Sequence, residues 1–91
     1  MLSENELIEC IDKIQAGDQL AFEKVYDNFS GALYGLCLKI LKDKDLAKDT
    51  LQESFVKIWK YSKSYSNKKG SFYTWMLNIT RNTAIDKYRK I

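Results

Sequence analysis

Asparagine and arginine side chains recur on one face of a predicted helix near the end of the chain. Asn78, Arg81, Asn82 and Arg89 are spaced at i, i+3, i+4 and i+11, which aligns them along one stripe of an α-helix. Planar amide and guanidinium groups can hydrogen-bond to base edges as well as phosphates, whereas lysines alone follow the backbone. The stripe therefore indicates nucleic-acid binding, although on charge alone an ordinary solvated face fits equally well.

Aromatic residues are interleaved with lysines just before and at the start of this helix. Rings can stack on unpaired bases while cations hold the phosphates, so the mixture is typical of a site for single-stranded nucleic acid. Phe72 and Trp75 also fit an apolar helix face, and we expect both to be buried. Tyr61, Tyr65 and Tyr73 remain the stacking candidates. The lysines interleaved with the aromatic residues are Lys63, Lys68 and Lys69.

Two carboxylates one helical turn apart form a second cluster. Asp49 and Glu53, with Gln52 beside them, face away from the apolar positions of their segment. Such a pair could act as an acid and a base or bind a metal, but a convex face without a third ligand suits neither role. Two interpretations stay open, which are an ordinary solvated face and a docking surface for Arg or Lys of another protein.

The formal charge of +3 conceals two oppositely charged halves. Residues 1–50 contain 6 basic and 10 acidic side chains, whereas residues 51–91 contain 9 basic and 2 acidic ones. The net charges of the halves are therefore −4 and +7. This asymmetry favours a polyanionic partner for the C-terminal half.

Composition excludes several classes of function. The 91 residues suffice for one small domain, and without histidine there is no Ser-His or Cys-His nucleophile and no imidazole acid or base. We expect no enzyme, no metal site and no cofactor. Cys10 and Cys37 lie far apart on apolar stretches, which predicts two buried, reduced thiols. No apolar run could span a membrane and no secretory signal is evident, so a soluble, cytoplasmic protein is expected.

Four amphipathic segments position these residues, and we predict an all-α fold, a compact bundle of three to four helices. The second helix runs to about Leu41. Its Gly31 and Gly35 predict a bend near residue 30 or a close helix crossing, of which the crossing is favoured. Residues 61–70 form the one substantial loop. Capping signals are Ser3 with Glu6, Asp18 and Ser71, and Gly17 is expected to end the first helix.

The third and fourth helices each have a predicted core face. A charged turn at 42–45 precedes the third helix, which should bury Ala47, Leu51, Phe55 and Ile58. The fourth should bury Phe72, Trp75 or Met76, Ile79 and Thr83, and continue towards Tyr88.

Three linked blocks of residues follow in order from about Cys10 to Lys90. They comprise Asp18, Ala21, Phe22 and Tyr26, then Ala47, Asp49, Gln52, Glu53, Phe55 and Trp59, then Ser71, Phe72, Thr74, Trp75, Ile79, Arg81, Asn82, Ala84, Asp86 and Arg89. These blocks resemble region two of bacterial sigma factors, most closely the extracytoplasmic-function (ECF) group. The resemblance implies that residues 1–91 form a region two domain with the helical fold of that family.

The resemblance also implies a partner for each cluster. In sigma factors the helix with Asp49, Gln52, Glu53 and Val56 docks on the clamp helices of the β′ subunit of RNA polymerase. The loop and last helix bind the non-template strand of the promoter −10 element, capture a flipped base and hold the duplex melted. An anti-sigma factor is a further candidate partner. The DNA contacts implied are Tyr65, Lys68, Lys69, Tyr73, Thr74, Asn78, Arg81, Asn82 and Arg89.

The sequence departs from the family pattern in places. Lys48 stands where a second acidic residue is common, and Asn78 stands where arginine is frequent. The loop varies widely in the family, so residues 62–70 do not reveal a promoter sequence. No second helical domain, region four, follows the last helix, so the chain is expected to be a fragment of a longer factor.

An alternative hypothesis is a helical protein-interaction module that regulates another transcription factor without binding DNA directly. The basic stripe would then serve solubility or an acidic partner. A preference for single-stranded over double-stranded DNA distinguishes the two, because only the sigma factor hypothesis predicts it.

Overall fold

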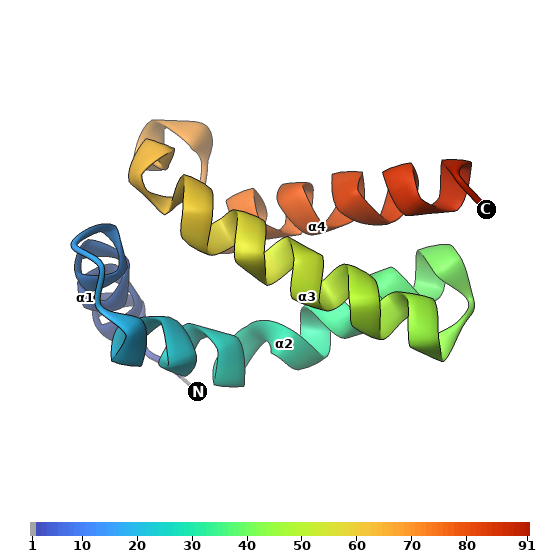
Figure 1. Cartoon of the computed structure of the whole chain (residues 1–91). Coiled ribbons are helices and arrows are strands. Elements are labelled where there is room, and N and C mark those ends of the chain that lie inside the picture. The colour runs from blue at the N-terminus through green and yellow to red at the C-terminus, as the bar shows by residue number, and fades with distance from the viewer. Residues whose placement is uncertain (1) are drawn as a thin grey trace.

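The computed structural model describes residues 2–91, with the side chain of Lys69 excepted. Within these residues the chain forms four α-helices and two short 3₁₀ helices and no strand, so the all-α prediction is confirmed (Figure 1). The elements are α1 (Glu4–Gln15), α2 (Gln19–Leu41), α3 (Lys44–Tyr61), η1 (Ser62–Ser64), η2 (Asn67–Lys69) and α4 (Phe72–Arg89).

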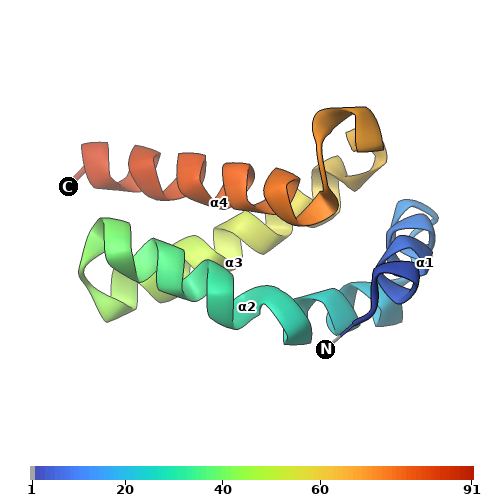
Figure 2. The ribbon, with the colours of Figure 1, turned by 180° about the vertical axis from the view of Figure 1, so that it is seen from behind.

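Three of the helices lie alongside one another and the first lies across their end. α2, α3 and α4 run along the length of the domain, and α1 crosses one end of this group (Figures 1 and 2). The loop between α3 and α4 is at the same end as α1, whereas the α2–α3 turn and the C-terminus are at the opposite end (Figure 1). α1 and the loop are thereby brought together although they are far apart in sequence.

Short polar signals begin and end the helices as expected. Ser3 and Glu6 form the capping box of α1, and Gly17 follows the helix with a positive φ of 93°. Asp18 and Ser71 accept hydrogen bonds from the first-turn amides of α2 and α4. The charged turn is shorter than predicted, because Asp43 already caps α3 at its start.

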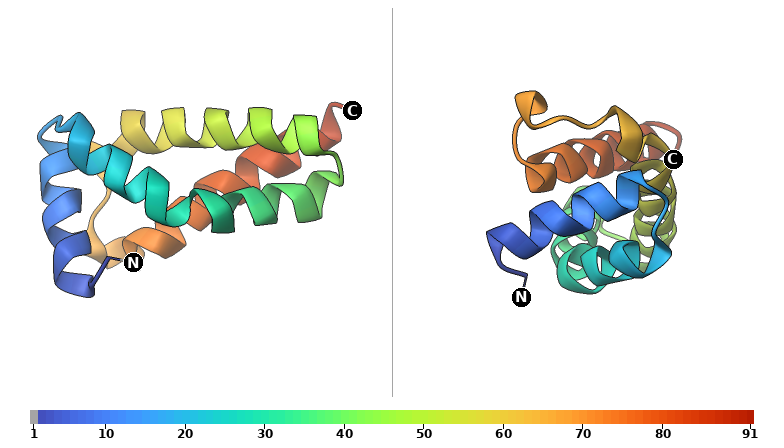
Figure 3. Two further views of the ribbon diagram at one scale, coloured as in Figure 1. Left: turned by 90° about the horizontal axis from the view of Figure 1, so that it is seen from below. Right: turned by 90° about the vertical axis from the view of Figure 1, so that its left-hand side faces the viewer.

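The glycines of α2 do not mark a close helix crossing. α2 continues through Gly31 and Gly35, both of which are exposed. A side-chain carbon added at either glycine would have no neighbouring atom within 4 Å, so the favoured prediction of a close crossing is wrong. The helix changes direction near its middle instead (Figure 3), in agreement with the alternative of a bend.

The core lies where α2, α3 and α4 meet. The predicted face of α3 is confirmed, with Ala47, Leu51, Phe55 and Ile58 all buried. Opposing side chains come from both neighbours, including Val25 and Leu33 of α2 and Met76 of α4. α3 is therefore enclosed on two sides, and a strip along the rest of the helix faces solvent.

The buried face of α4 agrees with the prediction only in part. Phe72, Met76 and Thr83 are buried as predicted. Trp75 and Ile79 are half-buried instead, and Tyr88 is 61% exposed because it lies beyond Ala84, the last buried residue of the helix. Thr80, which the apolar pattern does not single out, is fully buried instead. A small polar side chain at this position lets α4 approach its neighbours closely. The buried residues of α4 are Phe72, Met76, Thr80, Thr83 and Ala84.

Both cysteines are free and buried, as predicted. Cys37 is fully enclosed, and this burial raises the pKa of its thiol to about 11. In the part of the chain that the structure describes, no helix has the length and apolar character needed to cross a bilayer.

Replacing Gly35 with alanine should stabilise the domain. The new methyl group enters open space on a regular helix, so Gly35→Ala should raise the free energy of unfolding by about 0.5–1 kcal/mol. Urea denaturation followed by circular dichroism measures this change. Gly17→Ala is the matched control and should destabilise, because its positive φ is unfavourable for residues with a side chain. Destabilisation by Gly35→Ala would contradict the structure.

The thiol of Cys37 should be unreactive in the folded domain. At pH 8 a buried thiol with a raised pKa offers neither access nor thiolate to a disulfide reagent such as DTNB. We expect slow reaction of native Cys10→Ser protein, which retains only Cys37, and rapid reaction after unfolding in urea. Rapid labelling without urea would show that the site is open.

Candidate nucleic-acid and protein interfaces

The solvent-facing strip of α3 carries the predicted docking residues. Asp49, Gln52, Glu53 and Val56 are all exposed, and their spacing of i, i+3, i+4 and i+7 aligns them on one side of the helix. Val56 is 64% exposed, whereas Leu51, Phe55 and Ile58 of the same helix are buried. We call these four residues the α3 stripe. It combines carboxylates, an amide and an apolar side chain.

Two members of the α3 stripe already have intramolecular partners. Glu53 accepts a hydrogen bond at 2.7 Å from the ammonium group of Lys87 on α4, and this bond raises the pKa of Lys87. Gln52 donates a weak hydrogen bond of 3.4 Å to the hydroxyl of Tyr26 on α2. Among the described residues, the side chains of Asp49 and Val56 are thus the freest of the stripe.

An apolar hollow adjoins the α3 stripe at Val56. It has a volume of about 450 Å³ and lies between α2 and α3. Phe22 and Trp59 line it with their ring centroids 5.1 Å apart. The structure leaves both rings half-buried. The sequence signal for this hollow was an aromatic residue on each of two predicted helices, Phe22 and Trp59, together with Val56 outside the predicted apolar face of its helix.

The polar stripe of α4 is presented to solvent as predicted. Asn78, Arg81, Asn82 and Arg89 are all exposed, and we call them the α4 stripe. Arg81 donates a hydrogen bond of 3.3 Å to the side-chain oxygen of Asn78, which orients both groups. Within residues 2–91 no group hydrogen-bonds to the side chain of Asn82, so its amide is available to a ligand. Thr74 is exposed near the start of α4, where its hydroxyl accepts a 3.0 Å hydrogen bond from Ser71.

The tyrosines differ in their availability for stacking. Tyr65 is half-buried, with its ring centroid 5.1 Å from that of Phe72 and 5.4 Å from that of Trp75. Tyr73 is half-buried as well and packs on a phenylalanine of α2. Tyr61 is 49% exposed with an ammonium group 5.5 Å from its ring centre, so it presents the most open ring of the three.

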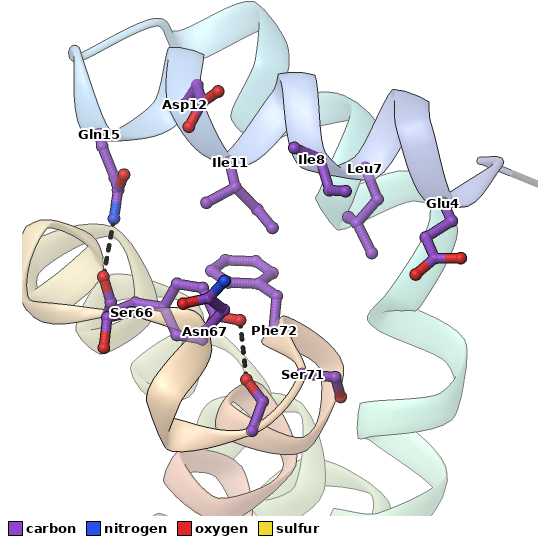
Figure 4. Close-up of a pocket in the computed structure, with 12 residues that line it drawn as sticks. Glu4, Leu7, Ile8, Ile11, Asp12, Gln15, Ser66, Asn67, Ser71 and Phe72 are labelled. Atoms are coloured by element: carbon purple, nitrogen blue, oxygen red, sulfur yellow. Dashed lines mark hydrogen bonds between the residues drawn. The ribbon is translucent and has the colours of Figure 1, made fainter.

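A larger hollow lies between α1 and the loop. Its volume is about 570 Å³, enough to admit a nucleobase, and its walls are partly apolar (Figure 4). Leu7 and Ile11 of α1 face Phe72 across it, and Tyr65 and Asn67 supply the loop side. Tyr65 also donates a 2.8 Å hydrogen bond to the carbonyl of Gly70, which closes the loop on itself.

The remaining predicted residues lie around this hollow and the loop. Lys68 is exposed in η2. The side chain of Lys69 falls outside the described residues.

No group of three or more acidic or cysteine side chains suited to a metal ion exists within the described part of the chain. The structure thus places the two carboxylates and the valine of the α3 stripe on a different helix from the basic, amide-rich α4 stripe, and the Lys87–Glu53 pair connects the two helices.

Comparison with known proteins matches these features to one family. The family described as sigma-70 region 2 matches residues 25–91. The ECF RNA polymerase sigma factor SigK of Mycobacterium tuberculosis (strain ATCC 25618 / H37Rv) is 28% identical over 85 residues, which cover 93% of this chain and 46% of the relative. SigK of Mycobacterium ulcerans (strain Agy99) is 29% identical over the same shares. SigK of Mycobacterium sp. (strain KMS) is 30% identical over 69 residues, or 76% of this chain and 36% of the relative.

The chain spans less than half the length of these relatives. The family match begins within α2 and continues through α3 and the loop to the last residue of the chain, so it includes both stripes. The relatives named above are ECF sigma factors, and on the family match this chain belongs to the sigma-70 region 2 family.

Proposed function

We propose that this domain acts in bacterial transcription initiation by joining RNA polymerase to promoter DNA. The α3 stripe docks on the clamp helices of the β′ subunit, and the loop with the α4 stripe binds the non-template strand of the −10 element. The observation that carries the proposal is the presence of two chemically opposite surfaces on separate helices within a region that matches the sigma family.

The chemistry of the α3 stripe suits a basic helical partner. Asp49 can accept a bidentate pair of hydrogen bonds from an arginine, and Gln52 can both donate and accept. Val56 and the hollow beside it add an apolar patch that a neighbouring side chain of the partner can cover. Glu53 joins the contact when a cation of the partner takes the place of Lys87.

The chemistry of the loop and α4 suits an opened DNA strand. Arg81 and Arg89 can hold phosphates, while Asn82 can read a base edge. The hollow between α1 and the loop can enclose one unstacked base. Unstacking costs a few kcal/mol, which stacking worth about 1–3 kcal/mol per base together with phosphate contacts can offset.

Melting of the promoter on this mechanism requires no catalytic residue. The domain binds the opened strand more tightly than the closed duplex and so shifts the population towards the open state. This role agrees with the lack of histidine in the chain.

Reversing one charge on the α3 stripe should weaken docking. Asp49→Lys replaces an attraction to a basic partner by a repulsion, so affinity for a β′ clamp-helix fragment should fall by about tenfold or more, as calorimetry would measure. Asp49 is preferred to Glu53 as the target because a lysine at 53 would also repel Lys87.

The matched control for this experiment is Asp27→Lys. Asp27 is exposed on α2, so the variant carries the same charge change outside the α3 stripe and should bind as the original does. Equal losses in the two variants, or no loss in Asp49→Lys, would refute docking through this stripe.

Two substitutions on α4 should separate base contacts from phosphate contacts. The probe is a single strand selected from a random DNA pool for binding to the complex of this chain with core polymerase. Asn82→Ala should lower affinity by about 5- to 50-fold without changing the salt dependence, because a neutral amide displaces no counterions. Arg89→Ala should instead reduce the slope of log affinity against log salt by about 0.7.

The control for both variants is Asn5→Ala, an exposed position on α1 that should leave affinity and slope unchanged. Fluorescence anisotropy at several salt concentrations provides both quantities. Unchanged binding in both α4 variants would contradict the proposed strand contacts and favour a module that binds only proteins.

A further inference from the structure

Gln15, the last residue of α1, connects this helix to the loop. Its side-chain amide donates hydrogen bonds of 3.0 Å to the carbonyl oxygens of both Ser62 and Tyr65. The bonds join positions 47 and 50 residues apart in sequence. The side chain is half-buried, so water competes with these bonds less than at an exposed site.

The two carbonyls belong to a single turn. Ser62 begins η1 and its carbonyl also accepts a 3.1 Å hydrogen bond from the amide of Tyr65, the residue that follows this turn. One NH₂ group therefore holds both ends of η1. This constraint fixes the direction in which the chain enters the loop after Tyr65.

The constraint continues from Tyr65 into the rest of the loop. The ring of Tyr65 packs on Phe72 and Trp75, and its hydroxyl donates to the carbonyl of Gly70. Gln15 thus holds the backbone of Tyr65, while the side chain of Tyr65 holds the far end of the loop. The hollow of about 570 Å³ is bounded on one side by α1 and on the other by this loop.

We propose that Gln15 is a positioning residue, which keeps the loop in the shape that captures an unstacked base. The inference rests on the proposed function and extends it to α1, which lies outside residues 25–91 that match the family. Gln15 acts through the carbonyls of Ser62 and Tyr65 and need not contact DNA itself. Without its amide, η1 and the loop are free to separate from α1, and the hollow loses its defined shape.

The test compares the chain with its Gln15→Met variant, each in complex with core polymerase. Methionine has a similar length and no charge, but it cannot donate to the two carbonyls. The probes are the selected single strand and a series of the same strand in which each base in turn is removed. Asn5→Met is the matched control, because it also replaces an amide side chain by methionine, at an exposed position of α1 that lines neither hollow.

The expected result is a loss of base discrimination without a general loss of binding. The original chain should bind the intact strand about tenfold or more tightly than the strand lacking the captured base, since stacking supplies that difference. In Gln15→Met this ratio should fall by about fivefold, because the loop without its two hydrogen bonds from Gln15 holds the capturing shape for only part of the time. Affinity for the abasic strand, its salt dependence and binding of the clamp-helix fragment should be unchanged.

A second measurement reports on the loop directly. Amide hydrogen exchange at Tyr65 and Gly70, whose amides are hydrogen-bonded within the loop, should be about fivefold faster in Gln15→Met than in Asn5→Met, because the loop is released from α1. This readout needs no DNA.

Three outcomes would overturn the inference. In the first, Gln15→Met keeps the original base discrimination. In the second, Gln15→Met lowers the affinity for the intact and the abasic strand by the same factor and also lowers the unfolding midpoint, which is a purely structural effect. In the third, the original chain binds the intact strand no more tightly than any abasic strand, which refutes base capture and with it the role of Gln15. Docking through the α3 stripe is tested separately by Asp49→Lys.

Discussion

The burial of α3 between α2 and α4 is the interaction on which the rest of the domain depends. Leu51, Phe55 and Ile58 each contribute about 1.5–3 kcal/mol when removed from water, so this helix cannot rotate without losing much of the core. A strip along the rest of the helix faces solvent. The docking residues occupy that strip, and the position of α4 against the other side of α3 sets where the DNA-binding stripe lies.

Polar contacts between α3 and α4 refine this arrangement. The Lys87–Glu53 pair is partly exposed, and exposed pairs of this kind contribute about 0–1 kcal/mol, so the pair does not hold the helices together. Buried Ser54 and Thr83 satisfy their hydroxyls on carbonyls of their own helices. Small side chains at these positions allow the helices to pack closely, while the charged groups remain at the surface where partners can reach them.

Much of the helical architecture could be predicted from local chemistry. The capping box at Ser3, the positive φ at Gly17 and the apolar face of α3 all depend on residues within a few positions of one another. The glycines of α2 were misjudged, because a sequence records a missing side chain but not whether a neighbour lies near it. The burial of Thr80 was missed for a related reason, since its polarity says nothing about the helix that covers it.

The sequence by itself determined the element types, the stripes on α3 and α4 and the family, because periodicity, capping and linked motifs are all encoded along the chain. Only the tertiary structure decided which tyrosine stays open, that Glu53 meets Lys87, and that the amide of Gln15 reaches the loop. These outcomes depend on how whole helices approach one another in space. Residues separated by tens of positions come into contact there, and no local spacing rule reports the distance between them.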